Sequence, residues 1–185
     1  MSEQGIDEHG LARRKAASRL GVGAIRSHPS DEEINAALIE YHQIYKPQAH
    51  AEELVRLRNL AAEAMRFLAA FVPVLSGGVW DGSANQYSPI VLHLFADTPE
   101  DVKRRLMDGG IPFDEEEHTP PFDDGKQTKQ PAFTFYADGT RIDLLLFPLT
   151  WKGRTLRKRG DQRPGGTLAD VLALLGRHAQ SSLEK

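Results

Sequence analysis

The chain has 185 residues, a formal net charge of −3 and no cysteine. This length suits one domain with a core of its own, and the small net charge gives no overall attraction to nucleic acid or to membranes. Without cysteine, the chain has no disulfide, no cysteine-ligated zinc and no thiol nucleophile. Its polar, acidic start and the lack of an apolar run of membrane-spanning length favour a cytoplasmic protein with no membrane partner.

Helical spacing of apolar residues predicts three helices in the first third of the chain, over residues 7–22, 28–45 and 51–71. The second of them opens with the capping-box sequence SDEE. The third has an apolar stripe made of Leu54, Leu57, Leu60, Ala61, Met65 and Leu68. Such stripes usually face a core, so we interpret residues 1–72 as a helical scaffold.

From residue 73 onward the pattern changes to strands and helices in alternation. The predicted elements, in chain order, are a strand at 88–96, a helix at 98–110, a hairpin at 131–148 and a helix at 167–178. The hairpin is expected to turn at Ala137–Thr140. This order indicates an α+β fold, in which residues 73–185 form a small mixed sheet with flanking helices.

Two charged segments separate these elements. Residues 114–130 are acidic and interrupted by proline and glycine, so we expect a mobile surface loop. Residues 150–166 form a basic loop that carries Trp151, and its cations are Lys152, Arg154, Arg157, Lys158, Arg159 and Arg163. This loop is either a contact surface for phosphate or single-stranded nucleic acid, or a solvated loop that balances the acidic segment.

Small residues cluster just before the predicted strand at 88–96. Gly77 and Gly78 follow an apolar run, and Gly82 and Ser83 come shortly afterwards. Glycine lets a backbone N–H approach a phosphate without an interfering Cβ, and a following helix start adds favourable partial charge. We therefore expect a turn that leads into a short helix, which is either a nucleotide-phosphate site or a tight turn without a ligand.

These glycines, the strand SPIVLHLF and the later sequence RIDLLLFP resemble the DNA polymerase β-like nucleotidyltransferase superfamily over residues 75–149. In that family a glycine turn holds nucleotide phosphates, and an acid-x-acid pair on the next strand binds divalent metal. A later, adjacent strand adds a third carboxylate. The resemblance assigns the glycine turn to phosphate binding and Asp143 to the third carboxylate, a metal ligand and catalytic residue. It implies a nucleotide as partner and Mg²⁺ or Mn²⁺ as cofactor.

The helical front resembles a second group of proteins. The sequences RRKAASRLGV and SDEEINAALIEYHQIY are similar to a bacterial group of comparable length, in which some members carry the name UDP-N-acetylmuramate–alanine ligase. Such a ligase needs an ATP-binding GxxxxGK[ST] loop. The chain has no such loop, so we do not expect that activity.

The chain departs from the nucleotidyltransferase pattern where the acid-x-acid pair would stand. Pro89 and Val91 occupy those two positions. Neither side chain can coordinate Mg²⁺, and a single carboxylate does not hold two metal ions in register. Pro89 also lacks a backbone N–H, which predicts that the strand begins at a sheet edge or a bulge.

His93 is the candidate replacement for a missing ligand. Residues two apart share a face of a strand, so Val91 and His93 point the same way. If Asp143 lies on the neighbouring strand with the same facing, His93 and Asp143 form a pair that orients a general base or offers two metal ligands. The structural alternatives are a histidine that only packs, and an edge-strand Asp143 paired with Arg141.

The sequence therefore leaves three functions open. The first is a nucleotide-binding protein of nucleotidyltransferase-like fold with a degenerate metal site. The second is an active nucleotidyltransferase that uses Asp143 and non-standard ligands. The third is a non-catalytic structural protein whose helical front binds a partner. The missing acid pair favours the first.

Overall fold

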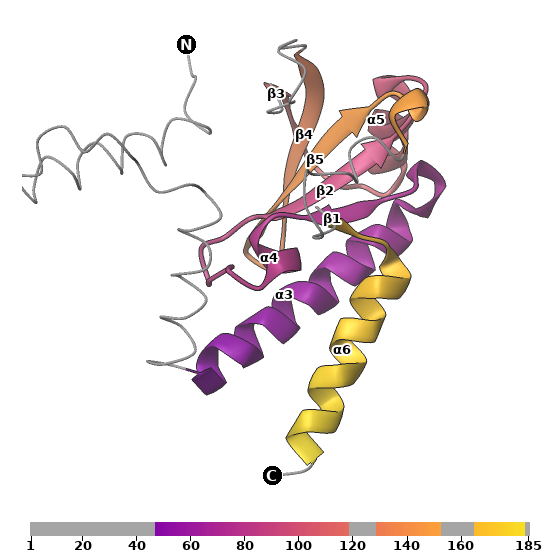
Figure 1. The fold of residues 1–185 in the computed structure, drawn as a ribbon. Helices are drawn as coiled ribbons and strands as arrows, with labels where there is room; N and C mark the ends of the chain where they lie inside the picture. Colours follow the sequence, from indigo (N-terminus) through magenta and orange to yellow (C-terminus); the bar gives the residue numbers. More distant parts are fainter. Residues whose placement is uncertain (1–46, 119–128, 153–164, 184–185) are drawn as a thin grey trace, which may run out of the picture. The chain divides into compact units, whose positions relative to one another are not determined.

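A computed structural model of the chain describes residues 47–118, 129–152 and 165–183 (Figure 1). The helices predicted at 7–22 and 28–45 lie outside these ranges. By its contacts the chain divides after Ile34, and residues 35–185 form one compact unit.

Six strands form one sheet, in the order β3-β4-β5-β2-β1-β6 (Figure 1). Their bounds are β1 Val74–Ser76, β2 Ile90–Phe95, β3 Asp114–His118, β4 Gln130–Ala137, β5 Thr140–Phe147 and β6 Gly165–Gly166. β2 and β5 run parallel, and the other neighbouring pairs are antiparallel. The mixed sheet and the α+β class are thus confirmed.

The helices are α3 Pro47–Phe67, α4 Gly78–Asp81, α5 Pro99–Asp108 and α6 Leu168–Leu183, with 3-10 turns η1 Ala69–Phe71 and η2 Leu149–Trp151. α3 and α6 pack against each other, and both contribute with α5 to the core on one face of the sheet (Figure 1). α5 has proline in its first turn together with Glu100 and Asp101, which favours a helix start there. Within the described ranges, no helix is long and apolar enough to cross a membrane.

The core lies between the helices and one face of the sheet. On β2 the side chains Ile90, Leu92 and Leu94 are fully buried, whereas the alternate residues Val91 and His93 are half-buried. The predicted stripe of α3 packs against this face: Leu54, Leu57, Ala61, Met65 and Leu68 are buried, and Leu60 is half-buried. β2 therefore follows the period of two expected for a strand, with one face in the core.

β4 and β5 form the predicted hairpin. Its turn consists of Asp138 and Gly139, with φ angles of 49° and 71°. A two-residue turn with positive φ at both positions matches the twist of the flanking strands, and Asp-Gly is a preferred sequence for it. Ala137 ends β4 and Thr140 begins β5, so the turn is two residues shorter than the four residues predicted.

Two predictions about strands are wrong. Residues 114–118, predicted as part of a mobile loop, form β3 and pair with β4. The acidic side chains of β3 are compensated locally, since Lys103 pairs with Glu115 and Lys129 with Glu117. β2 was expected to begin at an edge or a bulge, but it lies between β5 and β1, and the strand starts one residue after Pro89.

Candidate functional site

On the open face of the sheet, opposite the helices, one residue from each of four neighbouring strands lies in a single row. Ser76 of β1 is paired with Val91 of β2, and Val91 with Asp143 of β5. Asp143 is in turn paired with Thr134 of β4. Because neighbouring strands are about 5 Å apart, Val91 and Asp143 are adjacent side chains on one face. The glycine turn follows directly after Ser76, at one end of this row.

The turn leads into a short helix, as the sequence predicts. Gly77 has φ 69° and ψ −159°, a backbone conformation that is strained for any residue with a Cβ. The N–H groups of Trp80 and Asp81 donate to the Gly77 carbonyl at 2.9 and 3.1 Å, which closes the single turn of α4. A Cβ at Gly77 would lie 3.7 Å from Cγ2 of Val91. Because Gly77 has no Cβ, the backbone of the turn is not covered by a side chain on the side that faces Val91.

Arg58 of α3 holds α4 in place from the core side. The side chain is buried, with 5% of the residue exposed, and its guanidinium donates to the carbonyls of Val79 at 3.0 Å and Trp80 at 3.3 Å. Its Nη1 lies 3.1 Å from Nε2 of His178 on α6. Burial lowers the pKa of Arg58, and the negative charge of Asp81 partly offsets this. One side chain thus ties α3, α4 and α6 together.

Gly82 and Ser83 shape the exit from α4. Gly82 has φ 90°, and its carbonyl lies 3.0 Å from Nε2 of His50. The hydroxyl and the N–H of Ser83 donate to Oδ1 of Asp81, at 2.6 and 2.9 Å. Of the four residues predicted to bind phosphate, Gly77 is exposed and the other three are half-buried.

Gly78 is required by packing. A Cβ there would lie 3.1 Å from both the backbone N of Ala84 and Oγ of Ser83. Such distances are tighter than ordinary van der Waals contacts, so a side chain would push the exit of α4 outward. Gly77 is therefore needed for its backbone conformation, and Gly78 for its small size.

Asp143 lies inside the sheet, because β5 is flanked by β4 and β2, so the edge-strand alternative is wrong. Its pairing with Arg141 is present: Nε of Arg141 donates to Oδ1 of Asp143 at 2.7 Å. The hydroxyl of Thr134 donates to the same oxygen at 2.9 Å. The hydrogen bond to Asp143 raises the pKa of Arg141, which also lies 3.5 Å from Glu116. Oδ1 of the carboxylate is thus held by two protein groups.

His93 and Asp143 share the open face but are not paired. Asp143 is in register with Val91, and His93 with Leu145, one step further along the strands. Among the described residues, no hydrogen bond or ion pair joins His93 to Asp143. The geometry therefore places the two predicted catalytic residues near each other without direct contact.

The ring of His93 packs edge-on against Phe147, with ring centroids 5.1 Å apart. Burial lowers the pKa of His93 to about 4, and the nearby His118 lowers it further. Burial also lowers the pKa of His118, whereas Asp143 and Glu116 act in the opposite direction. His93 is therefore a neutral imidazole at pH 7, able to donate or accept one hydrogen bond at each ring nitrogen according to its tautomer.

A metal ion bound at Asp143, as predicted, would have only this one carboxylate ligand in the row of Ser76, Val91, Asp143 and Thr134. Val91, the neighbouring side chain on β2, offers no donor atom. Within the part of the chain that the structure describes, no three His, Asp or Glu side chains are grouped so as to hold a metal ion. Asp143 would also have to share its carboxylate with Arg141 and Thr134.

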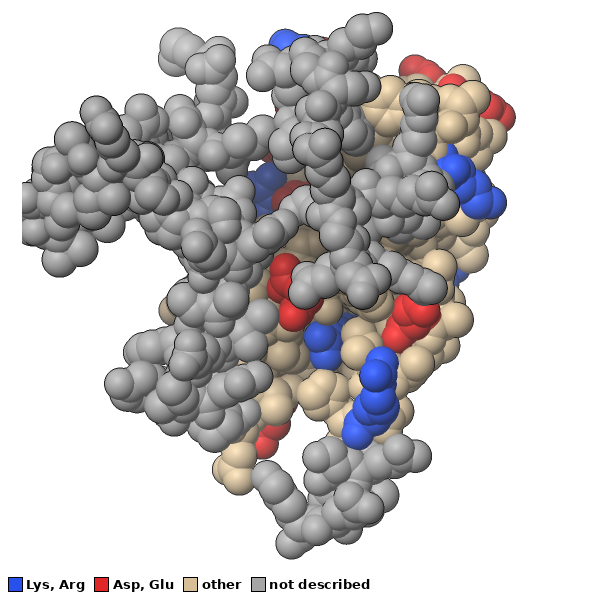
Figure 2. Space-filling view, in the orientation of Figure 1, with Lys and Arg blue, Asp and Glu red and all other residues tan. Residues whose placement is uncertain are grey.

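The basic loop is described only at its two ends, residues 150–152 and 165–166. Lys152 is exposed, and Trp151 before it stacks on Phe147 with centroids 6.1 Å apart. The remaining predicted phosphate contacts lie outside the described residues: Arg154, Arg157, Lys158, Arg159 and Arg163. On the described surface that faces the viewer in Figure 2, acidic and basic side chains are interspersed.

Sequence reasoning missed the support of the turn by α3. Arg58 stands between Leu57 and Ala61 in the apolar stripe, and a charged residue in such a stripe is a signal that it has buried partners. His50 offered no comparable signal, because its position in the first turns of α3 is ordinary for a polar residue.

Comparison with known proteins assigns no family. Neither a scan against protein-family models nor a search of curated proteins found a match to this chain.

Proposed function

We propose that the protein is a nucleotide-binding module with a nucleotidyltransferase-like fold that has lost metal-dependent catalysis. The support comes from the order of elements around the row. β1 ends in the glycine turn, α4 follows, and β2 then runs parallel to β5, which carries Asp143 next to Val91. This is the arrangement that the resemblance implies for a nucleotide site.

The observation that carries the non-catalytic half of the proposal is the state of Asp143. Its Oδ1 accepts hydrogen bonds from Arg141 and from Thr134. Two-metal phosphoryl transfer requires carboxylate oxygens that are free to bridge metal ions. A carboxylate that is already neutralised by a guanidinium, beside a valine, suits a structural role better than a metal site.

The part of the proposal that concerns nucleotide binding rests on Gly77, which is exposed. Its conformation is one that only glycine adopts without strain, and the side facing Val91 carries no Cβ. In the proposal the phosphates lie over this turn, and Lys152 with the cations of the basic loop contributes further charge. An active enzyme with non-standard ligands would instead need Asp143 to be released from Arg141.

Two glycine variants test the site. Gly77 and Gly110 have similar φ angles, 69° and 65°, and Gly110 lies after α5 with open space around it. Replacing either with alanine should destabilise the fold by about 1–3 kcal/mol, because both strain the backbone. Gly77→Ala should also weaken nucleotide binding by about tenfold or more, whereas Gly110→Ala should leave affinity unchanged.

The measurement is calorimetric titration of ATP, GTP, CTP and UTP into the full chain in the presence of EDTA. Equal nucleotide affinity of the two variants would reject the glycine turn as the site. Absence of nucleotide binding by the wild-type protein would reject the proposed function and leave a partner-binding protein.

A further inference from the structure

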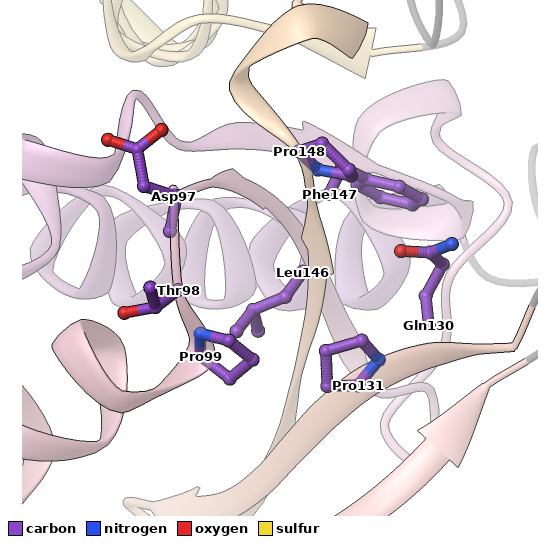
Figure 3. A pocket seen from close by; sticks show the side chains of 9 residues that line it. Asp97, Thr98, Pro99, Gln130, Pro131, Leu146, Phe147 and Pro148 are labelled. Carbon is purple, nitrogen blue, oxygen red and sulfur yellow. The ribbon is translucent and has the colours of Figure 1, made fainter.

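A pocket of about 170 Å³ lies at the end of the sheet where the parallel strands β2 and β5 finish and α5 begins (Figure 3). Its lining residues are Ala96, Asp97, Thr98, Pro99, Gln130, Pro131, Leu146, Phe147 and Pro148. It is separate from the candidate site, because Phe147 is four residues beyond Asp143, or about 13 Å along the strand.

The pocket exists because β4 and β5 part at this end. Their ladder runs from Ala137 paired with Thr140 to Ala132 paired with Leu145, and ends there. The next residue of β4 toward the pocket is Pro131, which has no N–H to continue the ladder. β4 remains attached to β3, where Gln130 is paired with His118. The space between the two diverging strands is the pocket.

Gln130 places an unpaired amide in the wall of this space. The residue is 6% exposed, yet among the described residues its side-chain amide has no hydrogen-bond partner. Buried side-chain amides nearly always have a hydrogen-bond partner. The amide of Gln130 is therefore a candidate to hydrogen-bond a ligand. Figure 3 shows the amide beside the ring of Phe147, on the wall opposite Thr98 and Pro99.

The other polar side chains of the lining are directed elsewhere. The carboxylate of Asp97 points away from Gln130 in Figure 3. The hydroxyl of Thr98 donates to Oδ2 of Asp101 at 3.0 Å, within the first turn of α5. The Gln130 amide is therefore the polar side-chain group that this lining offers to a ligand in the pocket.

The remaining walls are apolar and rigid. Three are proline rings, Pro99, Pro131 and Pro148, which have little conformational freedom. The ring of Phe147 is fixed by contacts with His93 and Trp151. Pockets for drug-sized ligands measure about 300–1,000 Å³, so this smaller space suits a single flat ring system.

We propose that the pocket binds a small planar group whose edge carries a hydrogen-bond donor next to an acceptor, and that Gln130 pairs with this edge. A glutamine amide offers one donor and one acceptor side by side, which is the geometry with which it pairs with the edge of adenine. A nucleobase and an aromatic carboxamide both present such an edge. This site does not depend on nucleotide binding at the glycine turn.

The test is NMR titration of the ¹⁵N-labelled full chain, following the side-chain NH₂ signals of Gln130. The probes are adenine, nicotinamide and toluene, the last being flat but without a polar edge. We expect adenine or nicotinamide to give a saturable shift at Gln130, with at least about tenfold weaker binding of toluene. A response to adenine alone identifies a nucleobase site, and a response to nicotinamide alone a carboxamide site.

Matched variants complete the test. Gln130→Met keeps the length of the side chain and removes both polar atoms, so it should lose at least about tenfold in affinity and raise the melting temperature. Gln48→Met, at an exposed position of α3, should change neither.

The proposal is overturned if toluene binds as well as the polar probes, if no probe shifts the Gln130 NH₂ signals, or if Gln130→Met binds the probes like wild type. Gln130→Leu serves the same purpose should the methionine variant not fold.

Discussion

The ion pair with Arg141 determines whether the carboxylate of Asp143 is available as a metal ligand. In the middle of a sheet, an isolated charge would be costly, and the 18% exposure of its side chain leaves it little water. Arg141, two residues earlier on the same strand and face, supplies the opposite charge, and Thr134 supplies a second hydrogen bond. The residue that resembles a metal ligand is thereby part of a protein ion pair.

The lowered pKa of His93 makes the stability of the fold depend on pH. Its pKa is about 4 in the folded protein and 6.5 as a reference for the unfolded chain. Between these values the unfolded chain binds more protons, so acid favours unfolding. The contribution is fully present above pH 6.5 and is lost as the pH falls toward 4, with a total of up to about 3 kcal/mol.

His93→Phe removes this titration and keeps an aromatic ring against Phe147. We expect its free energy of unfolding, measured by urea denaturation at several pH values, to fall less steeply than that of wild type between pH 6.5 and 4. Because His118 also has a lowered pKa, some slope should remain. Identical slopes in both proteins would show that His93 titrates normally in the folded state.

At the scale of elements, α4 is too short to be stable alone and depends on α3. A single helical turn leaves most of its carbonyls without intrahelical partners, and Arg58 binds two of them, those of Val79 and Trp80. Replacing Arg58 removes both hydrogen bonds, of which the one to Val79 is buried. The glycine turn is thus positioned by a side chain that belongs to a different element.

Arg58→Met should therefore destabilise the protein by about 2–3 kcal/mol and loosen the turn. Arg66→Met, an exposed arginine in the last turn of the same helix, should stay within about 0.5 kcal/mol of wild type. Urea denaturation gives the stabilities, and hydrogen exchange of the Gly82 and Ala84 N–H groups, both bonded to the Gly78 carbonyl, reports on the turn. Equal stability and unchanged exchange in the two variants would contradict this role.

Some elements could be predicted from the sequence because their own residues specify them. β2, α5 and the β4–β5 hairpin carry period-two or capping patterns and an Asp-Gly turn. β3 has none of these signals: its acidic run forms a strand because β4 offers a free edge and because Lys103 and Lys129 compensate its charge. That information lies in tertiary contacts, which periodicity does not contain.

β6 was missed for a related reason. It consists of Gly165 and Gly166, which have no side-chain pattern to detect. A Cβ at Gly166 would lie 2.1 Å from Cζ3 of Trp80, so glycine is needed there to let α4 pack against the strand. The reason for that residue lies in an element about 85 positions away, beyond the reach of any local window.

In the whole molecule, the two faces of the sheet have different roles: one face forms the core, and the other carries the candidate site. One face buries the core against α3, α5 and α6, and the other carries the row of Ser76, Val91 and Asp143 beside the glycine turn. The sequence predicted the candidate residues and the facing of Val91 and His93. It did not predict that Asp143 and His93 would be one register step apart, because strand pairing decides that distance.

Nucleotide affinity, measured with and without Mn²⁺ for folded wild type and folded Asp143→Asn, distinguishes a metal-independent nucleotide site from a metal-dependent one. We expect wild type to bind a nucleotide without metal. We expect Asp143→Asn to bind it equally well or better, because one negative charge near the phosphates is removed. A metal-dependent loss of affinity of tenfold or more, about 1.4 kcal/mol, would instead show that a metal ion bridges Asp143 and the nucleotide, and would reject metal-independent binding.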